Sequence, residues 1–186
     1  TGFYRTGRLL ASHHLVNSPD IVCLSKGITG GLLPLGATLC KEHIYTQFAT
    51  DDIYKTFFHG HSYTGNPLAL ALADTSLELL QQQHTLQRIL TISEKQAAFA
   101  TALLGKHQHI RCSTLGTVLS IEITNTQSTG YFSSLKERIY NYFLERDLLL
   151  RPLGNVLYFL PMYCFSETQM DTVHSTIDDF ITELKD

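Results

Sequence analysis

The first two apolar segments along the chain are short, and both are typical of strands. Residues 21–24 are apolar and β-branched, and residues 35–40 form a second run. We expect the first strand to be buried and parallel to its neighbours, because buried parallel strands consist of continuous apolar residues. Ser25-Lys26-Gly27 and a glycine pair lie between the two runs. Lys26 is therefore predicted at the carboxyl end of a strand, where open α/β sheets bind ligands.

Two helices are predicted after these strands. Asn66 and Pro67 supply an N-cap and a first helical position, and the Leu/Ala-rich run to about Leu80 is apolar on most faces, so we expect this helix to be buried. A second helix is predicted from Thr85 to its end at Gly105, and it could link two lobes. Its apolar positions recur every three or four residues: Leu86, Ile89, Leu90, Ala97, Ala100 and Leu104.

The back half of the chain alternates strand and helix patterns. Residues 110–123 predict two short strands or one bent strand, and residues 148–150 and 156–160 predict further strands. Ser134-x-x-Glu137 is a capping box for a helix that ends near Arg146.

A second capping box, Ser166-x-x-Gln169, begins the last predicted helix. The back half is thus predicted to be a small α+β domain in which a helix packs on a sheet. The apolar stripe of this helix comprises Met170, Val173, Ile177, Phe180, Ile181 and Leu184.

Composition narrows the class of protein. The formal net charge of −3 argues against a nucleic-acid partner, which would require a basic face. The chain has neither an apolar stretch of membrane-spanning length nor a signal-peptide pattern, so we expect no membrane association and a cytoplasmic location.

The four cysteines form no C-x-x-C pair, and we expect them to be buried residues rather than disulfide partners or zinc ligands. Because the chain begins with Thr rather than Met, we interpret it as truncated.

Lys26 is the main candidate for chemistry. Between a buried strand and a glycine-rich loop, its side chain should be partly removed from water, and this favours the neutral, nucleophilic amine that a Schiff base requires. Its immediate neighbours alone would favour an ordinary surface lysine at a strand end. The longer segments on either side decide between these interpretations.

Three segments in order resemble class III pyridoxal-phosphate-dependent aminotransferases. Residues 1–7 (TGFYRTG) are similar to a Thr-Gly-Phe-x-Arg-Thr-Gly loop, residues 19–31 to the cofactor-lysine segment, and residues 58–69 to the segment that reaches the cofactor phosphate of the partner subunit. The resemblance implies that Lys26 holds pyridoxal 5'-phosphate and acts as the general base.

In the third segment, the resemblance implies that Ser62 binds the phosphate, that His61 is a wall of the cofactor pocket and that Gly60 contacts substrate. Glycines allow close approach of a backbone, and a hydroxyl before a helix can bind phosphate. Ser62 could also be a turn hydroxyl that bonds its own backbone. His59-x-His61 could be part of a metal site, although two histidines without a third ligand are weak grounds.

Residues 150–161 (LRPLGNVLYFLP) resemble a stretch of the diaminopelargonic acid synthases within this family. The resemblance implies that Arg151 binds the substrate carboxylate, a task suited to its planar guanidinium. An ordinary arginine at a strand end is the alternative. Arg5 and Tyr158 are weaker candidates for the same pocket, and Arg5 could instead form a structural ion pair.

The resemblance implies a reaction in biotin biosynthesis, the transfer of an amino group from S-adenosylmethionine to 8-amino-7-oxononanoate. Other class III enzymes that use ornithine or 4-aminobutyrate, and a non-catalytic truncated chain that binds the cofactor, remain alternatives. The family places an acidic residue that holds the pyridine nitrogen before Thr1, so we expect this chain to be inactive alone.

The implied architecture is α/β, the C-terminal part of fold type I of the pyridoxal-phosphate-dependent transferases. We expect the end of a large cofactor-binding domain at residues 1–84, a connecting helix at 85–105 and a small α+β domain at 106–186. The resemblance also implies a homodimer in which the Ser62 loop completes the pocket of the other subunit. Without that partner, the helix at 68–80 should expose apolar surface.

Overall fold

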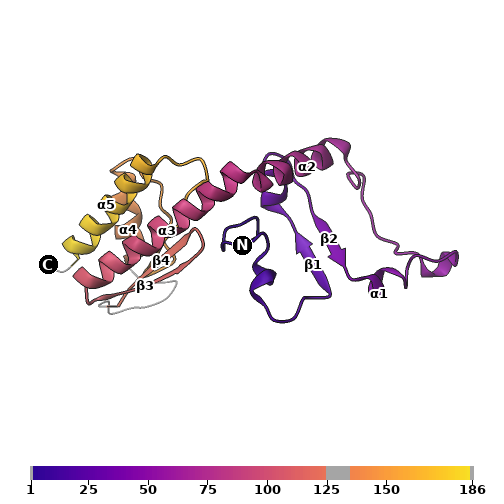
Figure 1. Ribbon diagram of the computed structural model, residues 1–186, viewed down its shortest axis with the longest axis horizontal. Helices are drawn as coiled ribbons and strands as arrows, with labels where there is room; N and C mark the ends of the chain where they lie inside the picture. The colour runs from indigo at the N-terminus through magenta and orange to yellow at the C-terminus, as the bar shows by residue number, and fades with distance from the viewer. Residues whose placement is uncertain (1, 125–134, 185–186) are drawn as a thin grey trace. The chain divides into compact units, whose positions relative to one another are not determined.

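The protein is described by a computed structural model of residues 2–124 and 135–184. It divides into two compact units: the first comprises Thr1–Phe3 and Arg8–Leu86, and the second comprises Tyr4–Gly7 and Gln87–Asp186. The predicted limits 1–84, 85–105 and 106–186 stay a prediction. Figure 1 labels the α-helices and the strands β1 to β4. In chain order the elements are η1 (Ala11–His14), β1 (Ile21–Leu24), η2 (Lys26–Thr29), β2 (Ala37–Cys40), α1 (Glu42–Tyr45), η3 (Ile53–Lys55), α2 (Pro67–Gln81), α3 (Gln83–Lys106), β3 (Ile110–Leu115), β4 (Val118–Ile123), α4 (Leu135–Leu144), β5 (Val156–Phe159) and α5 (Glu167–Glu183).

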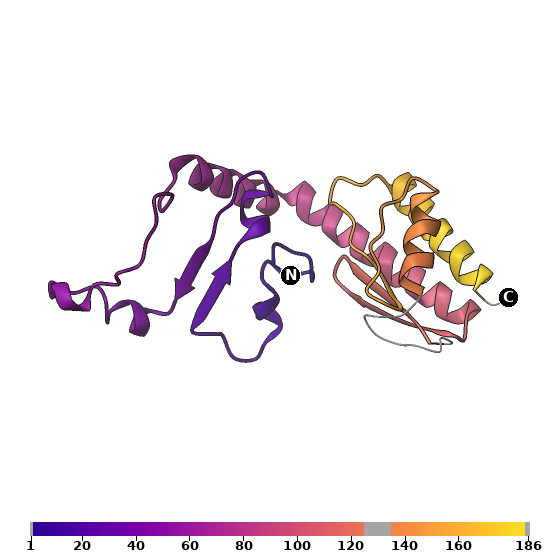
Figure 2. The ribbon, with the colours of Figure 1, turned by 180° about the vertical axis from the view of Figure 1, so that it is seen from behind.

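In the first unit, β1 and β2 form an antiparallel pair, which Figure 2 shows from behind. Ile21 pairs with Cys40 and Leu24 with Ala37. The prediction of a buried, parallel first strand is wrong, because Ile21 is 54% exposed and the connection to β2 contains a single short 3-10 helix, so the chain reverses. β2 begins at Ala37 rather than residue 35, after the strand-breaking Pro34 and Gly36.

α2 begins at its predicted cap. The Asn66 side-chain oxygen accepts hydrogen bonds from the backbone N–H groups of Leu68 at 3.0 Å and Ala69 at 3.4 Å. Ala69 and Ala73 are buried, whereas Leu68 is 69% exposed. The prediction of a buried helix is therefore wrong for this chain, and the expectation that the helix exposes apolar surface is confirmed.

The second unit contains an antiparallel sheet in the order β3-β4-β5. β3 and β4 form a hairpin in which Leu115 pairs with Val118, so the prediction of two short strands over residues 110–123 is confirmed. The strand predicted at residues 148–150 is absent, because these backbone groups bond locally: the N–H of Leu148 donates to the carbonyl of Phe143 at 2.9 Å. The second predicted strand is present as β5.

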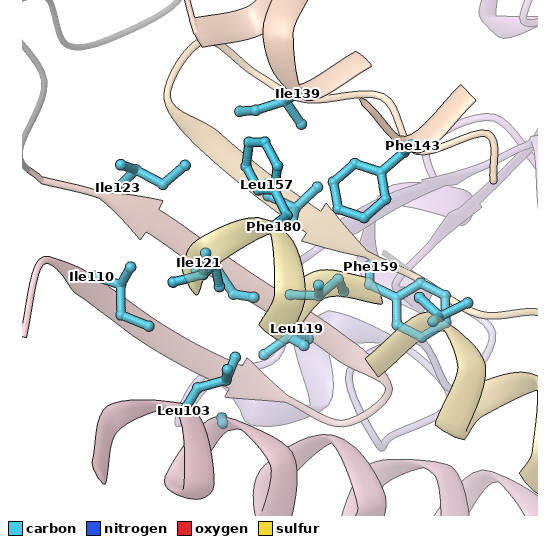
Figure 3. Packing of buried hydrophobic residues seen from close by; sticks show 14 of the residues in the cluster. Leu103, Ile110, Leu119, Ile121, Ile123, Ile139, Phe143, Leu157, Phe159 and Phe180 are labelled. Carbon is cyan, nitrogen blue, oxygen red and sulfur yellow. The ribbon is translucent and has the colours of Figure 1, made fainter. Parts of the chain in front are cut away.

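Helices and sheet of the second unit enclose one hydrophobic core, shown in Figure 3. Along β4, Leu119, Ile121 and Ile123 alternate with partly exposed residues and are almost completely buried. Phe143 of α4 and Phe180 of α5 have ring centroids 5.4 Å apart. Fully burying one such side chain contributes about 1.5–3 kcal/mol to stability. This core therefore fixes the rotation of α4 and α5 about their own axes.

The last helix matches its prediction closely. Ser166 and Gln169 form the predicted capping box, with bonds of 3.1 and 2.8 Å. The predicted stripe of α5 is buried except for Leu184, which is partly buried at its end. The predicted α+β arrangement of the back half is confirmed.

α3 departs from its predicted limits. α3 begins at Gln83, and Gly105 lies inside its last turn rather than after it. Ile89 and Ala100 are buried as predicted, but Leu86, Leu90 and Leu104 are exposed, because the buried stripe runs instead through Ile89, Ile92, Gln96, Ala100 and Leu103. α4 ends at Leu144, close to the predicted end near Arg146, and the proposed cap residue Ser134 lies outside the described residues.

All four cysteines are free thiols, but the prediction that they are buried is wrong. Cys23 and Cys40 lie on the two-stranded sheet and are exposed, as is Cys164. Cys112, on β3, is partly buried, and this burial raises the pKa of its thiol to about 11.

Candidate functional site

Lys26 is the first residue of η2, and Ser25 alone separates it from the end of β1. Its φ is 55°, in the left-handed region, where a non-glycine residue costs about 1–2 kcal/mol. Ile28 and Thr29, which follow it, are buried, and the Thr29 hydroxyl donates to the carbonyl of Leu33 at 2.6 Å. A strained residue persists only where its surroundings hold the backbone, so Lys26 stands on a fixed support.

Residues of α2 and of the first segment of the chain also hold the backbone beside Lys26. The Ser76 hydroxyl of α2 donates to the carbonyl of Gly27 at 3.5 Å. A Cβ on Gly27 would lie 2.7 Å from the Phe3 ring, so a glycine is required for this packing. The Lys26 side chain is exposed, and the prediction that it is partly removed from water is wrong for this chain, because burial in η2 begins at Ile28.

The segment before α2 is a polar turn. The His61 N–H donates to the Thr64 hydroxyl at 3.0 Å, and the Tyr63 N–H donates to His61 Nδ1 at 3.1 Å. Gly60, His61 and Ser62 are all exposed. Within the described residues the Ser62 hydroxyl has no hydrogen-bond partner, so it does not form the turn bond that was the alternative to phosphate binding.

Metal binding by the two histidines of this segment was the other alternative. Across residues 2–124 and 135–184, no group of three or more His, Cys, Asp or Glu side chains could hold a metal ion.

Arg151 lines a pocket of about 650 Å³ in the second unit. Leu149 and Pro152 also line the pocket, together with Lys136, Glu137, Tyr140 and Asn141 of α4. Pro152 is buried, whereas Arg151 is exposed, so the backbone beside this arginine is anchored and its guanidinium is accessible. A planar cation of this kind can bind a carboxylate through two hydrogen bonds.

Tyr158 lies on β5, opposite Ser120 of β4. Its neighbours Leu157 and Phe159 are buried in the core, whereas Tyr158 is partly exposed. Successive side chains of a strand point to opposite faces, so Tyr158 faces away from the core.

Arg5 is held by the second unit. Its Nη1 donates to the carbonyl of Pro161 at 2.5 Å, and its guanidinium lies 4.5 Å from the centroid of the Tyr163 ring. Its own carbonyl accepts bonds from the Thr117 N–H at 3.1 Å and the Thr117 hydroxyl at 3.2 Å. These contacts favour a structural role for Arg5. Its guanidinium bonds to the Pro161 carbonyl and lies over the Tyr163 ring, and within the described part of the chain it does not form the ion pair that the sequence suggested as an alternative.

The candidate residues fall into two groups. The first unit carries Lys26, Gly60, His61 and Ser62, and the second carries Arg5, Arg151 and Tyr158. Covalent attachment of an aldehyde cofactor requires an accessible primary amine on a rigid backbone, and Lys26 provides one. The accessible Ser62 hydroxyl is chemically suited to a phosphate oxygen. The residues present therefore fit pyridoxal phosphate.

The sequence did not reveal a buried polar network in the second unit. Gln96 is completely buried, and its amide donates to the carbonyls of Thr117 at 3.1 Å and Phe159 at 3.4 Å. Its oxygen lies 2.9 Å from Nε2 of His174, which is also buried. The only signal in the sequence was that both residues fall within apolar helical stripes.

A second missed interaction holds the chain after β5. Arg88 of α3 donates to the carbonyls of Tyr163, at 2.8 Å, and Phe165. Together with Arg5, it anchors residues 161–165 through their backbone.

A family model described as aminotransferase class-III matches residues 1–181. An adenosylmethionine-8-amino-7-oxononanoate aminotransferase of Synechococcus elongatus is 40% identical over 185 residues, which cover 99% of this chain and 43% of that protein. The chain thus spans less than half the length of this relative.

Solved structures show the same relationship. The enzyme of that name from Methanocaldococcus jannaschii is 28% identical with a TM-score of 0.84, over 98% of this chain and 44% of that one. An acetylornithine aminotransferase from Elizabethkingia anophelis is 29% identical with a TM-score of 0.80, again over 98% and 44% of the two chains.

Proposed function

Because this chain belongs to the class III aminotransferases, we propose that it serves the pyridoxal-phosphate-dependent transfer of an amino group, with Lys26 as the residue that binds the cofactor. The predicted fold class, α/β as in the aminotransferases of fold type I, is confirmed by the similarity to solved structures. The observation that carries the proposal is the match of residues 1–181 to the class III family, and the accessible amine of Lys26 stands on a strained, well-supported backbone.

Pyridoxal phosphate, when bound, supplies the electron sink for the reaction. Lys26 would hold it covalently and, once released, would move a proton from the amine-bearing carbon of the substrate. In the proposed dimer, Ser62 would bind the phosphate of the cofactor held by the other subunit, and His61 and Gly60 would line that pocket. Arg151 would bind the substrate carboxylate, and Tyr158, partly exposed on β5, would contact the same substrate. Arg5 would act as a positioning residue through Pro161 and Tyr163.

For the specific reaction, we propose amino transfer from S-adenosylmethionine to 8-amino-7-oxononanoate, a step of biotin biosynthesis. The name of the 40% identical relative supports this choice, as does the Arg-Pro stretch that ends at Pro161. Another ω-aminotransferase activity, of the ornithine or 4-aminobutyrate type, is the second candidate. It is supported by the similarity to an acetylornithine aminotransferase.

We also propose that the chain acts as a homodimer in which the Ser62 segment completes the partner's pocket. Several large apolar side chains around this segment are exposed, including Phe57, Phe58 and Tyr63 at 65%, 81% and 76%. Exposed apolar surface of this extent is typical of interfaces between proteins. No helix in the described part of the chain is long and apolar enough to cross a membrane, and a cytoplasmic location remains our prediction.

The cofactor assignment is tested by chemical trapping. The protein is incubated with pyridoxal phosphate and reduced with borohydride, and labelled peptides are identified by mass spectrometry. We expect the label on Lys26, and Lys26→Ala should abolish it. Lys41 is the internal control, since its amine is 2.8 Å from the Asp20 carboxylate and should stay unlabelled. Equal labelling of both lysines would contradict the proposal.

The substrate assignment needs a panel of donors and acceptors, measured on this chain within a protein of the full length of its relatives, because the chain alone is expected to be inactive. Amino transfer from S-adenosylmethionine to 8-amino-7-oxononanoate, without transfer from ornithine or 4-aminobutyrate, would support the biotin reaction. The reverse pattern would favour the second candidate. Covalent labelling of Lys26 without transfer from any donor would indicate a non-catalytic chain that binds the cofactor.

A further inference from the structure

Residues 161–165, which follow β5, are held through their backbone by arginine side chains. Arg5 donates to the carbonyl of Pro161. Arg88 of α3 donates from Nε to the carbonyl of Tyr163 at 2.8 Å and from Nη2 to the carbonyl of Phe165. Because both donors of Arg88 belong to one planar group, they fix the direction of this backbone as well as its position. The proposed function gives a role to Arg5 but none to Arg88.

The same arrangement begins at the last residue of β5. The amide of the completely buried Gln96, also on α3, donates to the carbonyl of Phe159 at 3.4 Å. The carbonyl of every second residue from 159 to 165 therefore accepts a hydrogen bond from Gln96, Arg5 or Arg88. In a sheet, the N–H groups of a neighbouring strand would bond to alternate carbonyls in this way. Here side chains supply the donors, and two of the three come from α3.

Burial along the segment has the same period of two residues. Pro161 is buried, and Tyr163 and Phe165 are partly buried against the core, whereas Met162 and Cys164 are exposed. The Phe165 N–H donates to the carbonyl of Met162 at 3.1 Å and closes a turn. Core packing thus holds the side chains, while the arginines hold the backbone. Loss of the arginine bonds should shift the segment without removing its contacts with the core.

Tyr163 connects Arg88 to Arg5. Arg88 bonds to the carbonyl of Tyr163, and the Arg5 guanidinium lies 4.5 Å from the centroid of the Tyr163 ring. A cation is attracted to the face of an aromatic ring, so the position of the ring determines where the guanidinium is held. Burial raises the pKa of Tyr163 to about 12, and Arg5 lowers it by a smaller amount. A ring displaced into water would therefore titrate at a lower pH.

We propose that Arg88 is a positioning residue for substrate binding, which holds residues 161–165 so that Arg5 and Tyr158 keep their places. The inference rests on the proposed function, in which Tyr158 contacts the substrate and Arg5 positions the site. Arg88 itself does not touch the substrate. It acts through the carbonyls that it bonds and through the ring of Tyr163.

Tyr158 is coupled to the segment through the backbone of β5. It stands directly before Phe159 and three residues before Pro161, whose φ is fixed by its ring. A shift of Pro161 is therefore transmitted to Tyr158 over few rotatable bonds. We expect weaker substrate binding and unchanged chemistry once the substrate is bound, because Lys26 belongs to the other unit.

The test is steady-state kinetics of Arg88→Met and Arg88→Lys, measured on this chain within a protein of the full length of its relatives. Methionine keeps the apolar part of the side chain and removes the donors. We expect Arg88→Met to raise KM for the amino acceptor on the order of tenfold and to leave kcat within about twofold, the pattern of lost binding. Lysine keeps the charge but lacks the planar fork that bonds two carbonyls, so Arg88→Lys should resemble Arg88→Met more than the parent.

Lys95→Met is the matched control. Lys95 also lies on α3, but its amine bonds to α5, at 2.8 Å from the Asp171 carboxylate and 3.4 Å from the carbonyl of Glu167. This variant removes one cation from the same helix and should leave KM unchanged. Circular dichroism establishes that each variant is folded, and Arg88→Lys decides the question if Arg88→Met is not.

A second measurement reports on the segment directly. The phenol of Tyr163 is titrated by NMR of isotope-labelled tyrosine, and Tyr163→Phe assigns its signal. In Arg88→Met the pKa of Tyr163 should fall from about 12 toward its ordinary value of 10.0, because burial is the larger cause of the shift. In Lys95→Met it should stay where it is.

The outcomes separate this inference from the proposed function. A parent-like KM in the folded Arg88 variants would overturn the positioning role, and a lowered pKa of Tyr163 beside it would show that Arg88 supports the fold alone. A fall in kcat without a change in KM would also overturn it, as would a parent-like KM in Arg88→Lys, since charge alone would then suffice. Absence of transfer in the parent protein would overturn the proposed function and this inference together.

Discussion

Replacing His174 by glutamine should make the second unit less sensitive to acid. The His174 ring stacks on Phe99, with centroids 4.0 Å apart and planes inclined by 6°, and its Nε2 lies 2.9 Å from Gln96 Oε1. Because that oxygen can only accept, we assign the proton to Nε2. A glutamine at the same position can also donate to Gln96, but it cannot take up a proton.

The magnitude follows from the pKa of His174. Burial lowers it from 6.5 to about 4, while Asp171 raises it and Lys95 lowers it by smaller amounts. As the pH falls below 6.5, the unfolded chain takes up a proton that the folded chain refuses until about pH 4. The free energy of unfolding then falls by about 1.4 kcal/mol per pH unit. Between pH 7 and pH 5 the loss from this one residue is about 2 kcal/mol.

The assay is urea unfolding at pH 7 and pH 5. Unfolding is monitored by the hydrogen exchange of a peptide from β4, which reports on the second unit alone. His174→Gln should be less stable at pH 7 by about 1 kcal/mol, because it loses the aromatic stacking. Its further loss on going to pH 5 should be smaller than that of the parent chain by about 2 kcal/mol. His13→Gln, at an exposed position in the first unit, serves as the control.

An equal loss of stability between pH 7 and pH 5 in His174→Gln and the parent chain would refute this reasoning. It would mean that His174 is protonated in the folded state, or that its neutral form is not held by Gln96. Reduced acid sensitivity in the His13 control would equally show that the effect is not specific to the buried ring.

Three further predictions concern stability, each measured by urea unfolding. Gly116→Ala should destabilise the second unit by more than about 2 kcal/mol, because a Cβ there would lie 2.2 Å from the backbone nitrogen of Gly7 and φ is +57°; an effect below about 0.5 kcal/mol would show that this close approach is absent. Gly105→Ala, inside α3 with no atom within 4 Å of the added Cβ, should instead stabilise by about 0.5–1 kcal/mol, and a destabilised variant would argue against the helical assignment. Ser166→Ala should cost about 1 kcal/mol through loss of the capping box, whereas Thr172→Ala, on an exposed turn of the same helix, should cost less.

The sequence predicted a helix well where one short motif, such as a cap, or one apolar stripe defines it. The Asn66 cap and the Ser166 capping box each satisfy backbone groups within a few residues, so their effect does not depend on the rest of the chain. The stripe of α5 was predicted correctly because the core covers that face alone. The strand proposed at residues 148–150 failed because apolar residues there pack beside the core while their backbone forms turns.

The candidate site depends on contacts that local sequence does not contain. Three segments pointed to Lys26, but its exposure could be learned only from the structure. Arg5 was proposed for substrate or for an ion pair, and the structure shows bonds to Pro161 and stacking on Tyr163, which are far away in sequence. Gln96 and His174 were overlooked because periodicity does not distinguish a polar residue bonded within the core from one that faces water.

The docking of residues 4–7 on the second unit has a consequence for how that unit folds. The hydrogen bonds that join Arg5 to Thr117 and to Pro161 span 112 and 156 positions of the chain. Contacts between such distant positions impose a large entropy cost on loop closure and slow folding. During synthesis, the hairpin of β3 and β4 would emerge long after residues 4–7. The second unit could therefore finish folding only when residues 4–7 bind to the segments around Thr117 and Pro161, which are synthesised much later.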